Sequence, residues 1–215
     1  GEGGFRRGET ILIIGSAGAG KTLLALNFMR AGYQDAEKQK SSKKKIGIWI
    51  NLEGEIGTLQ FAIKGFKNDS ADLIALRKMI ESALPKDTIG KEQDTADYNY
   101  FKFFSFPPIK LDFNKIVFTL ETIFRHKDYE IDRLVIDSIT ELERARGAGQ
   151  PEVKAFLAGL IQFLRDRKIT SLFVSRSDTF FRSIDKIEEQ VSSLVDLIIC
   201  IRNFDMHNQI TKGLY

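Results

Sequence analysis

The sequence has one cysteine, Cys200, so no disulfide framework can hold the fold, and a reducing compartment is favoured. Free cysteine behaves as a small hydrophobic residue, and Cys200 stands in the apolar run LVDLIICI, so we expect it in the core. The two histidines, His126 and His207, lack metal-ligand spacing with a cysteine or with each other. We therefore assign neither histidine to a metal site.

Long hydrophobic runs, a signal peptide and an excess of one charge are also absent. No apolar run reaches the roughly 18 residues that span a bilayer, and no signal peptide precedes the first expected strand, so we predict a cytoplasmic protein without a membrane span. The 32 basic and 29 acidic residues give a net charge of +3, too balanced for whole-surface attraction to nucleic acid. We interpret the five lysines within 38–45 as a solvated loop, with binding of an anionic partner as the alternative.

Short apolar runs alternate with helical patterns, which predicts an α/β fold with a mostly parallel central sheet and helices on both faces. Most expected strands are continuous apolar runs, as buried parallel strands are; they cover 10–14, 46–52, 100–105, 134–137, 171–175 and 197–202. Expected helices cover 56–66, 113–124 after a capping Asp112, and 151–167.

The chain length suits a single domain, which we take to be 1–215. Residues 70–99 hold a short helical pattern and then a polar tract, which predicts a surface insertion, with a partner-binding element as the alternative. Both ends of the chain fall in segments that look structured, which is compatible with a piece of a longer protein.

The stretch GSAGAGKT lies between a predicted strand and a predicted helix and fits the phosphate-binding pattern G-x-x-x-x-G-K-[ST]. Its glycines let successive backbone N–H groups converge on phosphate oxygens at the positive end of a helix. Lys21 would reach the β and γ phosphates as a catalytic residue, and the Thr22 hydroxyl would ligate magnesium. The predicted nucleotide-binding residues are Gly15, Ser16, Ala17, Gly18, Ala19, Gly20, Lys21 and Thr22.

Two carboxylates follow other predicted strands. The run RLVIDSIT places Asp137 at the end of a buried strand, where it can hold magnesium opposite Thr22. The run IGIWINLEGE places Glu53 just past another strand, and sites in open α/β sheets gather at the carboxyl ends of strands. Glu53 could therefore deprotonate water for attack on the γ-phosphate, although an acid that initiates a helix is the alternative.

These segments together resemble the RecA-like ATPases of the KaiC type. The resemblance covers nearly the whole chain outside the insertion and is carried by GGFRRGETILIIGSAGAGKT, INLEGEIGTLQFAIKGF, RLVIDSIT, ITSLFVSRSDTF and LVDLIICIRNF. It implies a RecA-like P-loop fold, ATP and magnesium as ligands, and Glu53 as the catalytic base, because Glu53 matches the first residue of the family's acidic pair.

The chain departs from this family pattern at two places. Gly54 replaces the second acid of the pair, with Glu55 one place further on. Arg176 stands where family members usually carry a polar or acidic residue that senses the γ-phosphate. A contact of Arg176 with phosphate, a contact with a neighbouring subunit and a surface salt bridge all stay open, and we name Ser138 and Arg176 as possible sensors.

The resemblance also implies a homo-oligomer, a hexameric ring or a filament, with nucleotide between subunits and a basic residue reaching in from the neighbour. Lys212 is the nearest candidate for that residue. The leading prediction is a magnesium-dependent ATPase that acts as an assembly or signalling switch, with or without a protein partner. An (auto)kinase is one alternative, and an ATP-dependent DNA-binding recombination accessory protein, supported only by the lysine run, is another.

Overall fold

Six parallel strands and one antiparallel strand form the sheet at the centre of the molecule. The structure is a computed structural model, and it describes residues 4–38, 43–53, 100–106, 112–146, 151–176, 191–206 and 209–214. Within these residues the strand order is β3-β2-β4-β5-β1-β6-β7, and only β7 runs antiparallel, beside β6. The strands are β1 (Thr10–Gly15), β2 (Lys44–Asn51), β3 (Phe101–Ser105), β4 (Tyr129–Asp137), β5 (Thr170–Arg176), β6 (Leu197–Met206) and β7 (Gln209–Leu214).

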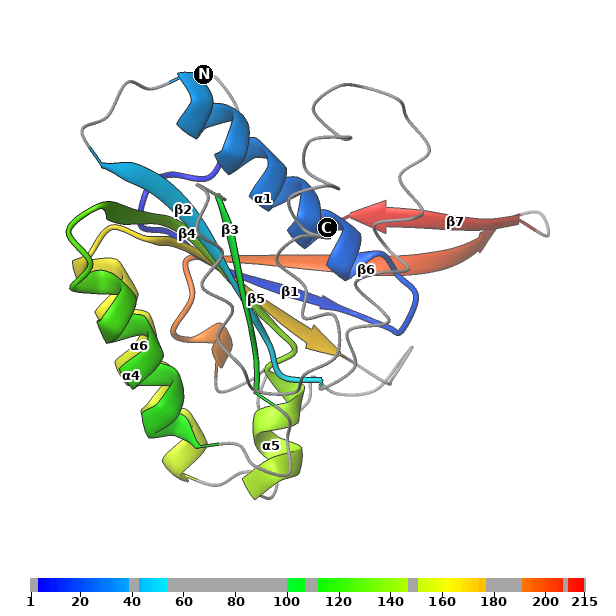
Figure 1. The fold of residues 1–215 in the computed structure, drawn as a ribbon. Helices are drawn as coiled ribbons and strands as arrows, with labels where there is room; N and C mark the ends of the chain where they lie inside the picture. The colour runs from blue at the N-terminus through cyan, green and yellow to red at the C-terminus, as the bar shows by residue number, and fades with distance from the viewer. Residues whose placement is uncertain are drawn as a thin grey trace.

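Helices cover both faces of the sheet, as the sequence predicts (Figure 1). Helix α1 (Lys21–Lys38) lies on one face, and α4 (Phe113–Phe124) and α6 (Pro151–Asp166) lie on the other. A short helix, α5 (Thr140–Arg146), follows β4 and was not predicted. The expected cap of α4 is confirmed, because the Asp112 side chain accepts a hydrogen bond from the backbone N–H of Asn114. The mostly parallel α/β fold is therefore confirmed.

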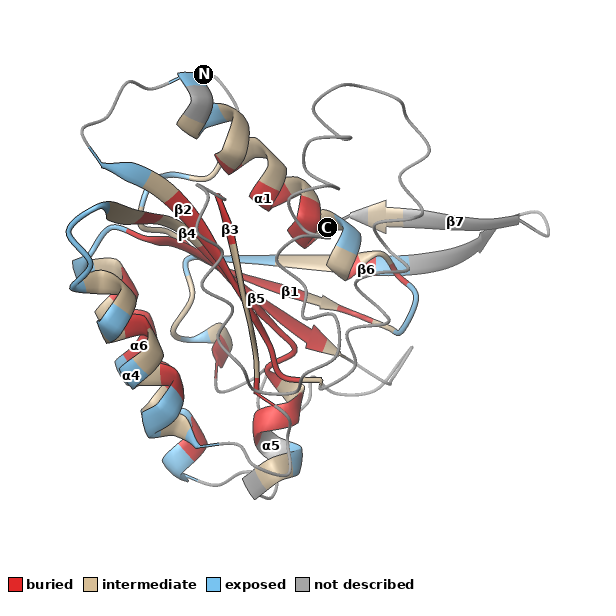
Figure 2. Cartoon of the chain, viewed as in Figure 1, coloured by how far each residue is buried: buried red, intermediate tan, exposed pale blue. Residues whose placement is uncertain are grey.

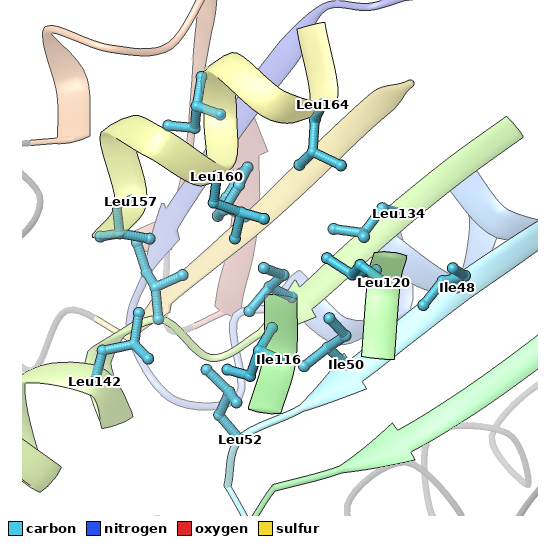
Figure 3. Packing of buried hydrophobic residues seen from close by; sticks show 14 of the residues in the cluster. Ile48, Ile50, Leu52, Ile116, Leu120, Leu134, Leu142, Leu157, Leu160 and Leu164 are labelled. Atoms are coloured by element: carbon cyan, nitrogen blue, oxygen red, sulfur yellow. The ribbon is translucent and has the colours of Figure 1, made fainter. Parts of the chain in front are cut away.

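Two hydrophobic layers hold the helices to the sheet, and strands β1, β2, β4 and β5 between them are mostly buried (Figure 2). Figure 3 shows the larger layer, in which side chains of β2 and β4 meet those of α4, α5 and α6. Fully burying one such leucine or isoleucine contributes about 1.5–3 kcal/mol. The labelled members are Ile48, Ile50, Leu52, Ile116, Leu120, Leu134, Leu142, Leu157, Leu160 and Leu164.

Alternation along the strands decides which side chains face α1. Ile48 and Ile50 belong to the layer under α4 and α6, whereas Trp49 belongs to the layer under α1. Successive side chains of a strand point to opposite faces, so Asn51 follows Trp49 onto the α1 side. Val135 lies under α1 in the same way, and Asp137 follows it. Polar residues at the ends of β2 and β4 thus face the helix that begins at Lys21.

Strand β4 begins at Tyr129, well before the predicted start at Leu134. Charged residues interrupt its apolar pattern at that end, and ion pairs explain why they are tolerated. Arg133 donates to Asp35 of α1 across 2.7 Å and to the backbone carbonyl of Phe28 across 2.7 Å. Asp132 faces Lys45 of β2 at 4.0 Å. These contacts tie the start of β4 to α1 and to β2.

Two further expectations need correction. The lysine run is not one loop, because Lys38 ends α1 and Lys44 begins β2, while residues 39–42 lie outside the described residues. Cys200 is only half-buried, since its strand β6 leaves Leu197 and Ile198 exposed. Trp49, within β2, is buried in the core. The predicted helix at 56–66 and the insertion at 70–99 lie outside the described residues.

Over the residues that are described, no helix has the length and the apolar character that crossing a membrane requires.

Candidate nucleotide site

The phosphate-binding stretch has the predicted arrangement of strand, turn and helix. Strand β1 ends at Gly15, and α1 begins at Lys21. Gly18 and Gly20 have φ angles of +74° and +104°, values that residues with a Cβ atom rarely adopt. At Gly15 the constraint is space, because a Cβ there would lie 2.6 Å from the backbone oxygen of Ile201 in β6. Space at Gly15 and backbone conformation at Gly20 therefore require glycine at the two glycine positions of the pattern, and backbone conformation also favours glycine at position 18.

Lys21 lies over this turn with its ammonium group against the backbone. Its Nζ donates to the carbonyl oxygens of Gly15, at 2.6 Å, and of Ser16, at 2.8 Å. The side chain is buried, so its charge acts in a region of low dielectric, where an electrostatic interaction is stronger than in water. Within the turn, the backbone N–H of Ala19 donates to the carbonyl of Ser16 at 3.2 Å. Because Gly15 is the last residue of β1, the contact of Lys21 with its carbonyl links the turn to the sheet.

Thr22 and Asp137 meet between α1 and β4. The Thr22 hydroxyl donates to Asp137 Oδ2 across 3.1 Å. Burial, and then the negative charge of Glu53, raise the pKa of Asp137 from its ordinary 3.8 to about 7, against the Thr22 hydrogen bond and the charges of Lys21 and Arg176. The two side chains that were predicted to share a metal are therefore neighbours. One of them, Asp137, is a buried acid whose burial outweighs the effect of the nearby positive charges.

Glu53 and Arg176 form an ion pair at the same edge of the sheet. Arg176 Nη2 lies 2.6 Å from Glu53 Oε1, with side chains 32% and 15% exposed. The backbone of Arg176 is fixed by Thr140, whose hydroxyl accepts its N–H at 2.8 Å. The backbone N–H of Glu53 donates to Asn51 Oδ1 at 3.4 Å. Of the contacts that the sequence left open for Arg176, the structure contains a salt bridge, and its partner is the candidate base.

Backbone hydrogen bonds join the strand ends that carry these side chains. The N–H of Leu52 donates to the carbonyl of Asp137, and the N–H of Ile139 donates to that of Val174. Ser138, between them, is buried, and within the described residues its Oγ has no hydrogen-bond partner. Gly54 and Glu55 lie outside the described residues, and Lys212 is placed only by its pairing with Asn203 in the β6–β7 ladder.

Sequence reasoning missed Asn51 and Thr140. Asn51 is a buried amide at the end of β2, and its signal was a polar residue closing an apolar strand two places before Glu53. The register pairs Asn51 with Asp137, so both side chains face α1. Thr140 gave no comparable signal, because its role depends on the unpredicted helix α5 lying beside the end of β5.

The residues present fit magnesium and a nucleotide. In the described part of the chain no three His, Cys, Asp or Glu side chains gather into a metal cage. Magnesium does not need one, since it commonly binds through one or two protein oxygens together with water and substrate phosphates. The Thr22 hydroxyl and the Asp137 carboxylate are oxygen ligands of this kind, and the glycine turn at the start of α1 suits phosphates.

Comparison with known proteins identifies the family of the chain. The family model described as "ATPase: KaiC" matches residues 1–214. The chain belongs to the KaiC family of ATPases. It is 24% identical over 213 residues to the circadian clock oscillator protein KaiC of Synechococcus elongatus, covering 99% of this chain and 34% of that protein. It is 22% identical over 212 residues to the KaiC of Thermostichus vulcanus, covering 99% and 34%.

A third relative, the circadian clock protein KaiC3 of Synechocystis, is 21% identical over 211 residues, which cover 98% of this chain and 35% of that protein. The present KaiC-family chain thus spans about a third of the length of the relatives it matches. Family membership agrees with the parallel sheet and the strand–turn–helix at Gly15, and the RecA-like α/β fold that the resemblance implied is confirmed.

Proposed function

We propose that this chain binds ATP with magnesium at Gly15–Thr22 and hydrolyses it. The observation that carries the proposal is the 3.1 Å contact between Thr22 Oγ1 and Asp137 Oδ2, because it joins the phosphate-binding helix to the only strand end with a buried aspartate among the described residues. Membership of an ATPase family supports it. Magnesium, when bound by Thr22 and Asp137, would offset the negative charge of the phosphates.

Glu53 takes the role of general base. A water oxygen forms a bond to the γ-phosphorus, the bond from that phosphorus to the bridging oxygen of ADP breaks, and the water proton passes to the Glu53 carboxylate. Lys21 lies at the turn and offers its ammonium group to the β and γ phosphates in place of the carbonyls it now contacts. Charge stabilisation of this kind is the main contribution of a protein to phosphoryl transfer.

Arg176 is the proposed sensor of the γ-phosphate. Its guanidinium is held by Glu53, and a phosphate bound in front of Glu53 would compete for the same donor. The competition would release the carboxylate when ATP, but not ADP, is bound. Ser138, buried next to Asp137, is the second candidate for this role. Such coupling would make the chain a nucleotide-driven switch of assembly or signalling.

The direct test is ATP turnover with magnesium by the wild type and by Glu53→Gln. Glu121→Gln is the matched control, because Glu121 lies on α4, on the other face of the sheet, and pairs only with Arg125 within the described residues. We expect turnover to fall by about 10²-fold or more in Glu53→Gln and to be unchanged in the control. Equal rates in all three proteins would remove Glu53 from the base role.

Assembly is the second part of the proposal. We infer a ring or filament with nucleotide between subunits from the family resemblance, and the particle mass in solution with and without ATP and magnesium tests it. A particle mass that does not change with nucleotide would argue against a nucleotide site shared between subunits. Phosphate found on serine or threonine after incubation with ATP would support the autokinase alternative, and salt-dependent DNA binding would support the recombination alternative.

A further inference from the structure

Asn51 presents a buried amide group without a complete set of hydrogen bonds. Its side chain lies at the end of β2, and the residue is only 7% exposed. Oδ1 accepts the backbone N–H of Glu53 at 3.4 Å. In the described part of the chain, Nδ2 has no hydrogen-bond partner. A buried donor without an acceptor is unfavourable for the fold, so its retention calls for an acceptor that the described residues do not supply.

The contact with Glu53 fixes which end of the amide is which. A backbone N–H can only donate, so the side-chain atom that meets Glu53 is the carbonyl oxygen. The NH₂ group therefore points away from the Glu53 backbone. Across the sheet Asn51 pairs with Asp137 of β4, and paired neighbours on parallel strands lie roughly 4.8 Å apart. The amide thus lies beside the buried carboxylate on the α1 face.

Charge makes this corner of the sheet suitable for water. The carboxylates of Asp137 and Glu53 are close enough to interact electrostatically, and both are hydrogen-bond acceptors when ionised. Asn51 Nδ2 and Ser138 Oγ are buried donors next to them. A water molecule can accept from a donor and give its hydrogens to a carboxylate, so it satisfies groups that cannot satisfy one another.

We propose that Asn51 is a catalytic residue whose Nδ2–H donates to the oxygen of the nucleophilic water, between Glu53 and the γ-phosphate. The inference rests on the proposed hydrolysis and deepens it. One water hydrogen is given to Glu53, one lone pair accepts from Asn51, and the other lone pair points at phosphorus. The proton leaves to Glu53 as the new phosphorus–oxygen bond forms, and the hydrogen bond to Asn51 is kept throughout.

The test compares Asn51→Leu with the wild type, with Asn114→Leu as the control on exposed α4 surface. Leucine has the branched shape of asparagine, with two larger methyl groups in place of the amide oxygen and nitrogen, and it cannot donate. We expect kcat for ATP to fall about 10²-fold, the loss typical for one oriented donor, with KM changed less than threefold. The Tm of the ligand-free variant is expected to stay at or above that of the wild type, because the unpaired buried donor is gone.

Binding measurements distinguish a failure of this inference from a failure of the proposed function. We expect Asn51→Leu to bind ADP with magnesium as the wild type does, and to lose at least tenfold in affinity for ADP with magnesium and aluminium fluoride, which mimics the phosphoryl group under attack by water. Normal affinity for that complex overturns the inference and leaves hydrolysis standing. A wild type that binds ADP and magnesium, yet neither forms the complex nor turns over ATP, removes the proposed hydrolysis and the inference together.

Two other outcomes also overturn it. Equal losses with and without aluminium fluoride would assign the amide to the water around the metal. A lower Tm in Asn51→Leu, restored in Asn51→Asp together with turnover, would show that Asn51 serves only as the acceptor for the Glu53 backbone, because aspartate keeps that acceptor and removes the donor.

Discussion

Arg176 Nη2 lies 2.6 Å from Glu53 Oε1, and this contact joins the ends of β5 and β2 across the end of β4. The register explains how it forms. Arg176 pairs with Gly15 of β1, so the arginine stands next to the first residue of the phosphate-binding turn. Arg176 therefore binds the candidate base from a backbone position beside the phosphate-binding turn, and a single cation could serve either anion.

Arg176→Ala is expected to weaken ATP binding more than ADP binding. The guanidinium would meet only the γ-phosphate, so its loss changes the ratio of the two affinities, by up to about tenfold for a partly exposed cation. Titration with each nucleotide measures the ratio, and Arg125→Ala, at the exposed end of α4, is the control. A variant that loses affinity for both nucleotides alike would show that Arg176 only supports the shape of the site.

Asp137 should make the ligand-free fold less stable as the pH rises. Its pKa in the fold is about 7, mainly because of burial, against an ordinary 3.8, so between these values the folded chain holds a proton that the unfolded chain has lost. The free energy of unfolding therefore falls from about pH 4 to about pH 7, by an amount on the order of a few kcal/mol. Asp137→Asn removes this slope. Urea unfolding of both proteins at pH 5 and pH 8 measures this pH dependence. The same change in the free energy of unfolding in the wild type and the variant would contradict the prediction.

The same carboxylate should make magnesium-dependent nucleotide binding weaken in acid. A metal ligand must be deprotonated, so protons compete with magnesium at Asp137 below about pH 7. We expect the gain in ATP affinity caused by magnesium to fall by up to tenfold for each pH unit below that value, and to be absent in Asp137→Asn. Calorimetry at pH 6 and pH 8, with and without magnesium, measures the gain. A gain that is equal at both pH values would argue against Asp137 as the ligand.

Asp196 provides a stability prediction of the opposite sign. Burial raises its pKa, but the hydrogen bond from the Thr10 backbone N–H and the ion pair with Arg165 outweigh this and lower it overall. An acid with a lowered pKa stabilises the fold above its ordinary value of 3.8 and loses that effect as the pH falls further. We expect Asp196→Asn to lower Tm at pH 7 and to have less effect near pH 3. A Tm loss of the same size at both pH values would mean that charge is not involved.

The sequence could predict those parts of the fold and of the candidate site that depend on local patterns. The strand–turn–helix around Gly15 follows from glycine positions, and the cap at Asp112 follows from one side chain. The early start of β4 could not be predicted, because Arg133 is tolerated there only through partners on α1. Likewise, the pairing of Arg176 with Glu53 depends on strand order, which no local pattern contains.

Two glycines give a final prediction, in which the same substitution has opposite effects. A Cβ at Gly15 would lie 2.6 Å from the backbone oxygen of Ile201, so Gly15→Ala must push β1 and β6 apart or displace the turn. At Gly159 a Cβ would meet nothing within 4 Å, and the residue lies inside α6, where alanine is the better helix former by about 1 kcal/mol.

We expect Gly15→Ala to lower both Tm and nucleotide affinity, and Gly159→Ala to raise Tm by about 2–4 °C without changing affinity. Thermal unfolding and a nucleotide titration of the two variants test this. Normal affinity in Gly15→Ala would mean that the turn at the start of α1 can shift without losing the phosphate, and the close contact with β6 would then matter for stability alone.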